Sequence, residues 1–329
     1  PTEFPRMTWA EAMERFGIDK PDTRFACELH CLGDWVPQSG FGVFAKVLEE
    51  GGRVMAIAIP GGGSSISRGA LKKYEKFAKE LGAGGLAWWK PAESGGAAGP
   101  MAKFCADESG TSLLKTLGAG EEDLILFSGG DQALVWRVLG ELRLRFAKDL
   151  GLIPEGLWNF LWVTEFPLFE WNAEQERWFS AHHPFTAPND WEMAGDPGKL
   201  LSRAYDLVLN GWELGSGSIR IHRQDTQKKI FELLGIGPEE QRAKFGFLLD
   251  ALSYGAPPHA GLGLGLDRLV ALTLGMDSIR DGVAFPKTTT AADAMCDAPS
   301  TVEDELLKEV HVRCELPEPV AEPDAKPAS

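Results

Sequence analysis

Residues 204–222 read AYDLVLNGWELGSGSIRIH, and this stretch carries the strongest structural signal in the chain. Its centre, Asn210-Gly211, is the preferred dipeptide of a two-residue type I′ turn, and apolar residues flank it on both sides. The cross-strand pairs set by such a turn are Leu209 with Trp212 and Val208 with Glu213. The stretch therefore predicts an antiparallel hairpin.

This hairpin brings two carboxylates to one face. Side chains alternate along a strand and cross-strand partners share a face, so Asp206 lies on the same face as Glu213. Diagonal neighbours of this kind lie roughly 7–8 Å apart. That spacing suits two acids that share one or two hard cations such as Mg²⁺, which prefers oxygen ligands and keeps several waters. The pattern indicates a polyphosphate site, and a surface hairpin that carries both acids for solubility is the alternative.

A second glycine-rich stretch, GLGLGLDRLVALTLG, begins at Gly261. Glycines at every second position leave one face of a strand without side chains, and a bare face can accept a flat ring. The leucines between them, Leu262, Leu264 and Leu266, are expected to anchor the other face in a core. Asp267 is a plausible helix N-cap, and Arg268 follows where it can stack on a base or grip a phosphate. These alternating glycines differ from the tight G-x-G-x-x-G phosphate turn.

Seven longer strings carry a resemblance to a known family. They are FPRMTWAEAM with GIDKPDTRF, LWVTEFPLFE, HHPFTAP, AYDLVLNGWELGSGSIRIH, EEQRAKFGFLLDALSYGAPPHAGLGLGLDRLVAL and DSIRDGVAFPKT. With them the chain resembles the C-terminal half of bacterial-type aspartyl-tRNA synthetases, class II enzymes, over nearly its whole length. The resemblance implies an aspartate-tRNA ligase, which activates L-aspartate with ATP to aspartyl-adenylate and transfers it to tRNA(Asp).

The same resemblance implies the fold class and the domain order. We expect an α+β protein, with the C-terminal half of an antiparallel-sheet catalytic domain and an inserted smaller α+β domain. The expected parts are 1–25, a catalytic-domain segment; 26–151, the bacterial-type insertion domain; 152–318, the catalytic half with the third class-defining motif; and 319–329, a disordered tail rich in Pro, Ala and acids.

The resemblance also assigns site residues. It implies that Asp206 and Glu213 hold Mg²⁺. The ATP-binding residues are Glu213, Gly265, Leu266, Asp267 and Arg268, and the arginine contacts the γ-phosphate. His182 and Arg220 bind aspartate, while a role for His183 is left open. ATP is a substrate here, and Mg²⁺ is the implied metal.

The position of Arg220 tests this assignment. It is seven residues beyond Glu213, so simple alternation puts it on the opposite face from both carboxylates. A β-bulge within Gly215-Ser216-Gly217 would reverse the alternation, and the assignment requires one. A surface salt bridge is the alternative role of this arginine.

Local patterns predict the remaining elements. Thr8 to Phe16 (TWAEAMERF) has a capping box with Glu11 three residues after Thr8. Between residues 26 and 151 we expect strands at GVFAKVL, RVMAIAI, GLAWWK and LILFSG, and helices at SRGALKKYEKFAKELG and DQALVWRVLGELRLRFAKDLG. Further helices are expected over 226–234 and 238–254. The stretch from Gly61 to Ser65 either cradles a phosphate or is a flexible loop.

Composition agrees with a globular protein: 44% of residues are hydrophobic and 25% charged. No apolar run approaches a membrane span, no signal-peptide pattern opens the chain, and a cytoplasmic location is expected. Five scattered cysteines indicate reduced thiols, and Cys27 and Cys31 lack the second pair of a zinc site. The net charge of -15 argues mildly against nucleic acid, because phosphate contacts come from Lys and Arg.

The chain starts at Pro1, and the resemblance places that start after the second class-defining motif. Motifs 1 and 2, the aspartate-binding lysine loop and the anticodon-binding domain would then belong to a longer product, which in this family is a homodimer. We therefore expect no aminoacylation from this chain alone. Alternatives are a ligase that also charges tRNA(Asn), a synthetase paralogue that activates an amino acid without tRNA, and an inert partner-binding module.

Overall fold

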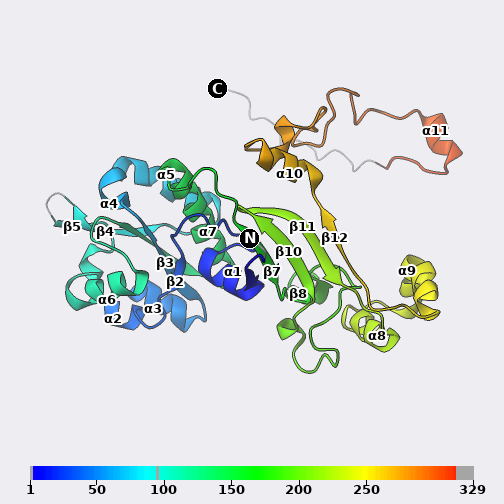
Figure 1. Ribbon diagram of the computed structural model, residues 1–329, viewed down its shortest axis with the longest axis horizontal. Helices are drawn as coiled ribbons and strands as arrows, with labels where there is room; N and C mark the ends of the chain where they lie inside the picture. Colours follow the sequence, from blue (N-terminus) through cyan, green and yellow to red (C-terminus); the bar gives the residue numbers. More distant parts are fainter. Residues whose placement is uncertain (1–2, 94–95, 316–329) are drawn as a thin grey trace, which may run out of the picture. The chain divides into compact units, whose positions relative to one another are not determined.

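The computed structural model describes residues 3–93 and 96–315, so the predicted tail lies outside the described part. The chain divides into two compact units, Pro1–Leu266 and Asp267–Ser329, which are described separately. The first unit holds two five-stranded sheets, sheet A and sheet B, and a two-stranded hairpin (Figure 1). In the described residues no helix combines the length and the apolar character needed to cross a bilayer.

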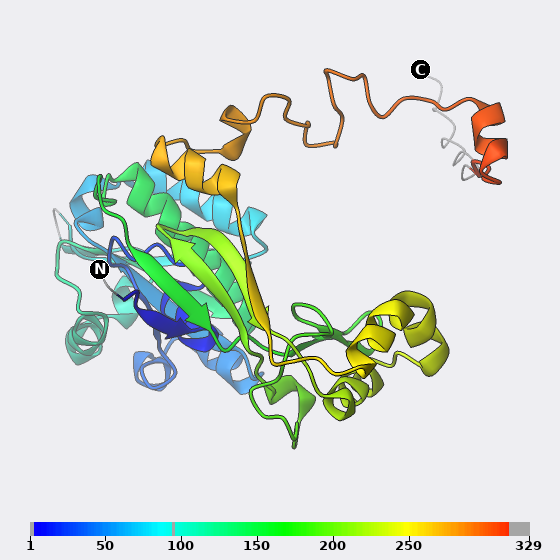
Figure 2. The same ribbon diagram turned by 45° about the vertical axis from the view of Figure 1, so that its right-hand side comes forward.

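Sheet A has the strand order β1-β7-β10-β11-β12. Its strands are β1 (Arg6–Thr8), β7 (Phe160–Thr164), β10 (Ala204–Leu209), β11 (Trp212–Ile219) and β12 (Ala260–Leu264). Only the β1–β7 pair is parallel, and the others are antiparallel, as the predicted fold class requires. Figure 2 shows the yellow-green hairpin of β10 and β11 with β12 alongside. The segment before residue 25 thus shares a sheet with segments beyond residue 152.

Sheet B has the order β2-β3-β6-β4-β5 and lies between the two parts of sheet A in sequence. Its strands are β2 (Leu29–Cys31), β3 (Arg53–Ile59), β4 (Ala87–Glu93), β5 (Gly96–Ala98) and β6 (Leu124–Gly130). Its strand pairs, within the described residues, are all antiparallel. Met55, Ile57 and Ile59 on β3 point into one core, whereas Val54 and Ala56 point into a second core. A strand buried on both faces explains the unbroken apolar run RVMAIAI.

Helices supply those two cores. They are α2 (Val36–Ser39), α3 (Gly42–Glu49), α4 (Gly62–Ser65), α5 (Arg68–Glu80), α6 (Asp107–Leu117) and α7 (Gln132–Asp149), with a 3-10 turn, η1 (Ala102–Phe104). Figure 1 shows α5 on one side of the strands of sheet B and α2, α3 and α6 on the other. The predicted helices at α5 and α7 are present, and Gly62–Ser65, part of the stretch left open between loop and phosphate cradle, is a single helical turn.

One predicted strand is wrong. GVFAKVL forms the helix α3, not a strand. In this helix Phe44 is buried and Val47 and Leu48 pack against the same core, while Val43 is 62% exposed, so the apolar residues cover one helical face rather than alternating. Short apolar runs of this length fit either element, and tertiary packing decides between them.

The helix α1 (Trp9–Phe16) begins as predicted at Thr8, whose Oγ1 accepts a hydrogen bond from Glu11 N at 3.1 Å. Such an N-cap contributes about 1 kcal/mol. The reciprocal half of the capping box differs, because the Glu11 carboxylate pairs instead with Arg15 at 2.6 Å. α1 ends at Gly17 with φ 69°, where a Cβ would lie 2.3 Å from the Trp136 carbonyl oxygen, so only glycine fits.

Arg143 on α7 fastens the segment that follows α1. Its side chain is fully buried, and its guanidinium donates to the carbonyl oxygens of Asp22, Phe25, Ala26 and Cys27 over 2.8–3.1 Å. Burial lowers the pKa of this guanidinium to about 10, and the group remains a cation at neutral pH. One side chain therefore satisfies four backbone acceptors where the chain passes from sheet A toward sheet B.

The remaining helices and strands of the first unit are β8 (Phe169–Asn172), β9 (Arg177–Ser180), η2 (Pro197–Lys199), α8 (Gln224–Leu233) and α9 (Pro238–Ser253). The last two match the predicted helices to within two residues at each end. β12 is the edge strand of sheet A, and its Leu262 and Leu264 are 41% and 61% exposed. The expectation that these leucines anchor a core is wrong, because their side chains project from a face of the sheet that none of the buried clusters of the described residues covers.

The second unit contains α10 (Leu266–Thr273, whose first residue belongs to the first unit), η3 (Ile279–Asp281) and α11 (Asp304–Glu309). Leu266 opens α10 and is 69% exposed, so it belongs to neither the strand nor a core. Asp267 lies inside the first turn of α10, not before it as an N-cap. An acid there still interacts favourably with the helix dipole.

Candidate functional site

The hairpin of β10 and β11 is built as the sequence predicts. Leu209 pairs with Trp212, and Val208 pairs with Glu213. Both turn residues have positive φ, 51° at Asn210 and 85° at Gly211, which is the requirement of a type I′ turn. Glycine is needed at the second of these positions, and asparagine is among the few residues that tolerate the first.

A β-bulge at Leu214 interrupts β11 just after Glu213. Val208 opposes Glu213, whereas the preceding residue, Leu207, opposes Gly215, so Leu214 has no partner on β10. The extra residue reverses the alternation of side chains beyond it. The prediction of a bulge is confirmed, but it lies one residue before the three-residue run in which we placed it.

Because of the bulge, odd-numbered residues before it and even-numbered residues after it on β11 lie on one face of the sheet. Ser216 lies directly opposite Asp206, and cross-strand partners share a face. Glu213 is on that face through its pairing with Val208, two residues from Asp206. Arg220 follows Ser216 at an even spacing, so its position continues the same face. This is the arrangement that the sequence assignment required.

Three residues of this face, Asp206, Glu213 and Ser216, line a cavity of about 430 Å³. His182, one of the predicted aspartate-binding residues, lines the same cavity. The remaining walls come from Trp9, Asp19, Phe166, Pro167, Glu170, Ala181 and Ala204. The cavity is therefore acidic, with four carboxylates in its lining. Such a lining favours cations or groups that carry a cation with them.

Asp206 is the carboxyl most perturbed by this environment. Burial raises its pKa to about 6, and the nearby charge of Glu213 also raises it. A hydrogen bond from the Ser216 hydroxyl opposes part of this effect. Burial destabilises the ionised form of this carboxyl group, and a cation bound beside it would offset that cost.

The two histidines sit beside the same face. His182 Nε2 lies 3.2 Å from Ser216 Oγ, and His183 Nε2 lies 3.4 Å from Ser218 Oγ. Burial and the charge of Arg220 lower the pKa of His183 to about 4. Partial desolvation at the cavity wall and the same arginine lower the pKa of His182, although part of its ring is open to solvent. Both rings are neutral at pH 7.

Arg220 lies just beyond the end of β11. Its backbone N donates to the His259 carbonyl oxygen at 3.0 Å, and it forms an isolated bridge with Thr186. Its charge acts on both His182 and His183. Arg220 is thus near enough for its charge to act on the two histidines, but unlike His182 it is not among the residues that line the acidic cavity.

The glycines of β12 extend this face. Gly263 opposes Ser216 and Gly261 opposes Ser218, so the bare positions lie on the side of Asp206. A Cβ at Gly261 would meet nothing within 4 Å, and one at Gly263 would meet only the Ser216 carbonyl oxygen at 3.9 Å. The open face expected of the alternating glycines is present beside the cavity.

The remaining predicted ATP-binding residues follow β12. Gly265 N donates to the Leu214 carbonyl oxygen at 2.7 Å, which ties it to the bulge. Leu266 is the last residue of the first unit, and Asp267 and Arg268 are the first residues of the second. The use of these last two residues together with Asp206 and Glu213 stays a prediction.

The donor set fits Mg²⁺ rather than a metal held by protein ligands alone. Within the described residues no cluster of three or more His, Cys, Asp or Glu side chains is arranged around a metal position. Two carboxylates on one cavity face offer hard oxygen donors, and Mg²⁺ usually completes its shell with waters and substrate phosphates. Asp206 and Glu213 would hold it here.

Sequence reasoning missed three polar residues of this cavity: Ser216, Asp19 and Glu170. Ser216 had a usable signal, because a bulge placed at Leu214 sets it opposite Asp206. Asp19 and Glu170 arrive from other elements, and no local pattern links them to the hairpin.

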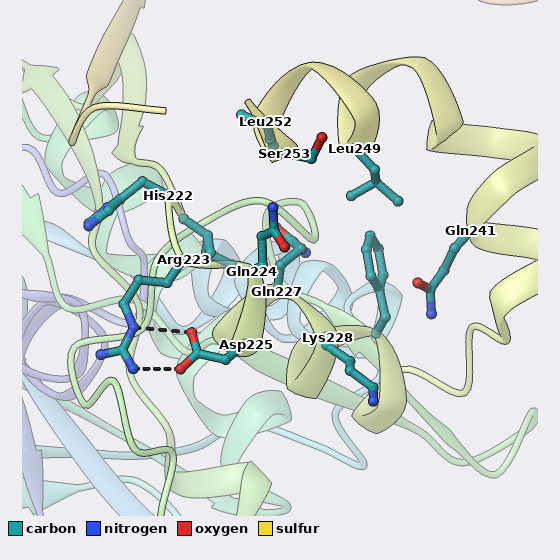
Figure 3. A pocket seen from close by; sticks show the side chains of 12 residues that line it. His222, Arg223, Gln224, Asp225, Gln227, Lys228, Gln241, Leu249, Leu252 and Ser253 are labelled. Carbon is teal, nitrogen blue, oxygen red and sulfur yellow. Dashed lines mark hydrogen bonds and ion pairs between the residues drawn. The ribbon is translucent and has the colours of Figure 1, made fainter. Parts of the chain in front are cut away.

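A second cavity, of about 380 Å³, opens between α8 and α9 (Figure 3). Leu249 and Leu252 line it from α9, while Lys228 lines it from α8 and Arg223 pairs with Asp225 at 2.6 Å. None of the predicted site residues lines this cavity. The chemistry suggested by the sequence therefore belongs to the acidic cavity beside sheet A.

Comparisons with known proteins identify the family of the chain. Residues 1–289 match the family model described as tRNA synthetases class II (D, K and N). The aspartate–tRNA ligase of Xanthomonas euvesicatoria pv. vesicatoria is 51% identical over 315 residues, covering 94% of this chain and 53% of that protein. The aspartate–tRNA ligase of Stenotrophomonas maltophilia is 51% identical over 314 residues, covering 94% and 54%.

Solved structures are similar over smaller parts. An aspartyl-tRNA synthetase from Entamoeba histolytica is 26% identical, with a TM-score of 0.32 over 47% of this chain and 26% of that chain. An asparaginyl-tRNA synthetase from Pyrococcus horikoshii is 28% identical, with a TM-score of 0.29 over 40% and 26%. The chain spans about half the length of the curated relatives it matches.

Proposed function

Because the chain belongs to the class II tRNA synthetases (D, K and N), we propose that it is part of an enzyme that activates L-aspartate with ATP and transfers it to tRNA(Asp). The single observation that carries this proposal is the shared cavity of Asp206, Glu213 and His182. It unites the residues that the family resemblance assigns to the metal, to ATP and to aspartate.

We propose the following roles. Asp206 and Glu213 would hold Mg²⁺, which when bound would supply positive charge to the phosphates of ATP and to the leaving pyrophosphate. Gly265, Leu266, Asp267 and Arg268 bind ATP, with the arginine at the γ-phosphate. The bare face of Gly261 and Gly263 accepts the adenine ring, since nothing there obstructs a flat group.

Arg220 and His182 bind the amino acid. The planar guanidinium of Arg220 pairs with a carboxylate through two parallel hydrogen bonds. The α-carboxylate of aspartate then attacks the α-phosphate of ATP and pyrophosphate leaves. A terminal tRNA hydroxyl next attacks the carbonyl carbon of the aspartyl-adenylate, so that the aspartyl group passes to the tRNA and AMP leaves. Neither step needs a covalent bond to the protein. Catalysis rests on holding the reactants in line and on neutralising phosphate charge.

The domain division is part of this proposal. Sheet B and its helices lie within residues 26–151, which we propose as the insertion domain, and sheet A is built from residues 1–25 and 152–318. We propose further that the enzyme is a cytoplasmic homodimer, as the family resemblance implies.

The test is aminoacylation by a chimera in which this chain replaces the matched segment of the Xanthomonas relative. We expect transfer of labelled aspartate, but not of asparagine or lysine, to tRNA(Asp). A parallel assay with tRNA(Asn) decides whether the enzyme also charges that tRNA. Aspartylation of neither tRNA by a chimera that folds and binds ATP would overturn the proposal.

A further inference from the structure

Trp9 belongs at the same time to two hydrophobic cores and to the acidic cavity. It directly follows β1 of sheet A and opens α1, which lies between the two sheets (Figure 1). Its side chain packs against the sheet A cluster that contains Met7 and Phe16, and against the sheet B cluster that contains Trp136 and Leu139. It also lines the acidic cavity. One side chain therefore connects the proposed site with the part of the chain that we propose as the insertion domain.

A third cavity, of about 340 Å³, adjoins the acidic cavity. Trp9, Asp19 and Glu170 line both cavities, so these residues form the boundary between the two spaces. Beyond the boundary, Arg137 and Glu141 of α7 line the third cavity, which we call the α7 cavity. Among the boundary residues only Trp9 has a large rigid ring. The position of that ring therefore determines how far the acidic cavity extends toward α7.

Trp136 of α7 contacts the Trp9 ring. The two indole rings meet edge to face, with centroids 6.1 Å apart and planes at 89°. Aromatic pairs prefer this geometry, because the positive edge of one ring meets the negative face of the other. Trp136 is 8% exposed, and its Nε1 has no hydrogen-bond partner among the described residues. What this residue offers Trp9 is therefore the surface of a ring, without a polar anchor.

The backbone of α1 is fixed independently of this ring contact. Gly17 ends α1, and a Cβ there would lie 2.3 Å from the Trp136 carbonyl oxygen, so the two backbones are in direct contact. Arg53 of β3 also pairs with Glu14 of α1 through two contacts of 2.7 Å. A change confined to the Trp136 side chain should therefore leave α1 in place and release only the Trp9 ring.

We propose that Trp136 is a positioning residue that holds Trp9 as the wall between the acidic cavity and the α7 cavity, so that the proposed insertion domain sets the shape of the site of aspartate activation. This inference rests on the proposed function and deepens it. With the ring in place, the acidic cavity ends at Trp9. With the ring released, the space extends toward α7 and a small amino acid loses contacts on one side. Aspartate binding should then weaken while the chemical step changes little.

Phe146 provides a matched control. It lies on the same helix and in the same core as Trp136, is fully buried, and stacks on Tyr74 with ring centroids 3.8 Å apart. It lines neither the acidic cavity nor the α7 cavity. Phe146→Leu should therefore destabilise the core, as Trp136→Leu does, because each removes an aromatic ring. It should not change the position of Trp9.

The first experiment follows the Trp9 ring by ¹⁹F NMR in the 329-residue chain labelled with 5-fluorotryptophan. The Trp9 signal is assigned by its loss in Trp9→Phe. The difference in its chemical shift between H₂O and D₂O measures the exposure of the ring to solvent. This difference should be larger in Trp136→Leu than in the wild type. Trp136→Phe keeps an aromatic ring and loses no hydrogen bond within the described residues, so it should retain the wild-type value.

The second experiment measures the effect on the site in the chimera. Trp136→Leu should raise the KM for aspartate roughly two- to tenfold, the range of one aromatic contact, with little change in kcat. Trp136→Phe should restore the wild-type KM, and Phe146→Leu should leave it unchanged. The double variant of Trp9→Leu and Trp136→Leu should have the KM of Trp9→Leu alone, since a residue that acts only through Trp9 then has nothing left to position.

Several results would overturn the proposal. An unchanged solvent shift of Trp9 in Trp136→Leu would do so, as would an equal change in Phe146→Leu. Additive effects of the Trp9 and Trp136 substitutions on KM, or a larger solvent shift with an unchanged KM, would do so as well. Should Trp136→Leu not fold, Trp136→Met takes its place, because methionine fills irregular gaps in a core.

Failure of the proposed function has a different signature. A folded wild-type chimera without aspartate-dependent exchange would reject that function. The fluorine measurement on the 329-residue chain would still decide whether Trp136 positions Trp9. Exchange activity combined with an unchanged Trp9 signal would reject the role of Trp136 alone.

Discussion

Asp206 and Ser216 lie directly opposite each other on β10 and β11. The register set by the turn, which pairs Val208 with Glu213, would by itself place Gly215 opposite Asp206. The unpaired Leu214 adds one residue to β11 and so shifts the register by one, which brings Ser216 opposite Asp206. Without it Ser216 and Arg220 would face away from Glu213. The bulge is therefore the feature that assembles the proposed site on one face of the sheet.

Deletion of Leu214 should abolish the site while the hairpin turn persists. The side chains beyond the deletion would move to the opposite face, so we expect aspartate-dependent exchange to fall at least about a hundredfold in the chimera, as when transition-state contacts are lost. The control is Leu214→Ala, which keeps the residue count. Because Leu214 is 3% exposed, that variant should lose about 2–5 kcal/mol of unfolding free energy in a urea titration yet keep most of its activity. Equal activity in the two variants would show that strand phase is not the cause.

Asp206→Asn should weaken Mg²⁺-ATP binding and stabilise the fold. Loss of a charged ligand should reduce Mg²⁺-ATP affinity roughly ten- to a hundredfold, which corresponds to about 1.5–3 kcal/mol. Because burial raises the pKa of Asp206, ionising it destabilises the folded state as pH rises from the unfolded value through about 6. At pH 7 the free energy of unfolding of Asp206→Asn should therefore exceed that of the wild type by about 1 kcal/mol, after allowance for solvent screening. Urea titrations at pH 7 and pH 4 check this, since the gain should vanish at the lower pH.

The same pKa sets the pH dependence of metal binding. Below pH about 6 a proton competes for Asp206, so Mg²⁺-ATP affinity should fall with decreasing pH in the wild type. Calorimetric titrations between pH 5 and pH 8 measure this trend. The residual binding of Asp206→Asn should change less over that range, and parallel profiles would assign the titration to another group.

His183 should make the fold sensitive to acid. Its pKa is lowered to about 4, chiefly by burial, so the unfolded state binds the proton more readily. Stability should be complete above the unfolded value near 6.5 and decrease as pH falls toward about 4. We expect a loss of about 1 kcal/mol, reduced from the full effect because the ring is only half-buried. Urea midpoints from pH 7 to pH 4.5 should drop less in His183→Gln than in the wild type or in the exposed control His259→Gln.

Arg143→Lys should destabilise the first unit by about 2–4 kcal/mol. Lysine lacks the planar fork that reaches four carbonyl oxygens, and each unpaired buried acceptor is costly. Arg145→Lys, on the same helix but more than half exposed, is the matched control and should change stability by less than about 0.5 kcal/mol. Similar urea midpoints for the two variants would contradict the role of Arg143.

Local chemistry explains which parts of the fold could be predicted. Asn210-Gly211 determines its turn from two residues, and Thr8 caps its helix through one hydrogen bond. The strand predicted at GVFAKVL failed because a seven-residue apolar run suits a helix face equally well, and only packing of Phe44 decides.

The site was predictable where its residues share the hairpin. Asp206, Glu213 and Arg220 follow from strand phase once a bulge is allowed. Asp19 and Glu170 reach the cavity from distant elements, which strand phase cannot reveal. The exposed Leu262 and Leu264 show the same limit, because period-two patterning identifies a strand but not whether anything covers it.

The most direct test of the central claim is ATP–pyrophosphate exchange in the chimera, with and without L-aspartate. We predict exchange that depends on aspartate and on Mg²⁺, and that is lost in Glu213→Gln while the Glu232→Gln control on α8 keeps it. Aspartate-independent exchange, or full activity in Glu213→Gln, would contradict the assignment of this cavity as the site of aspartate activation.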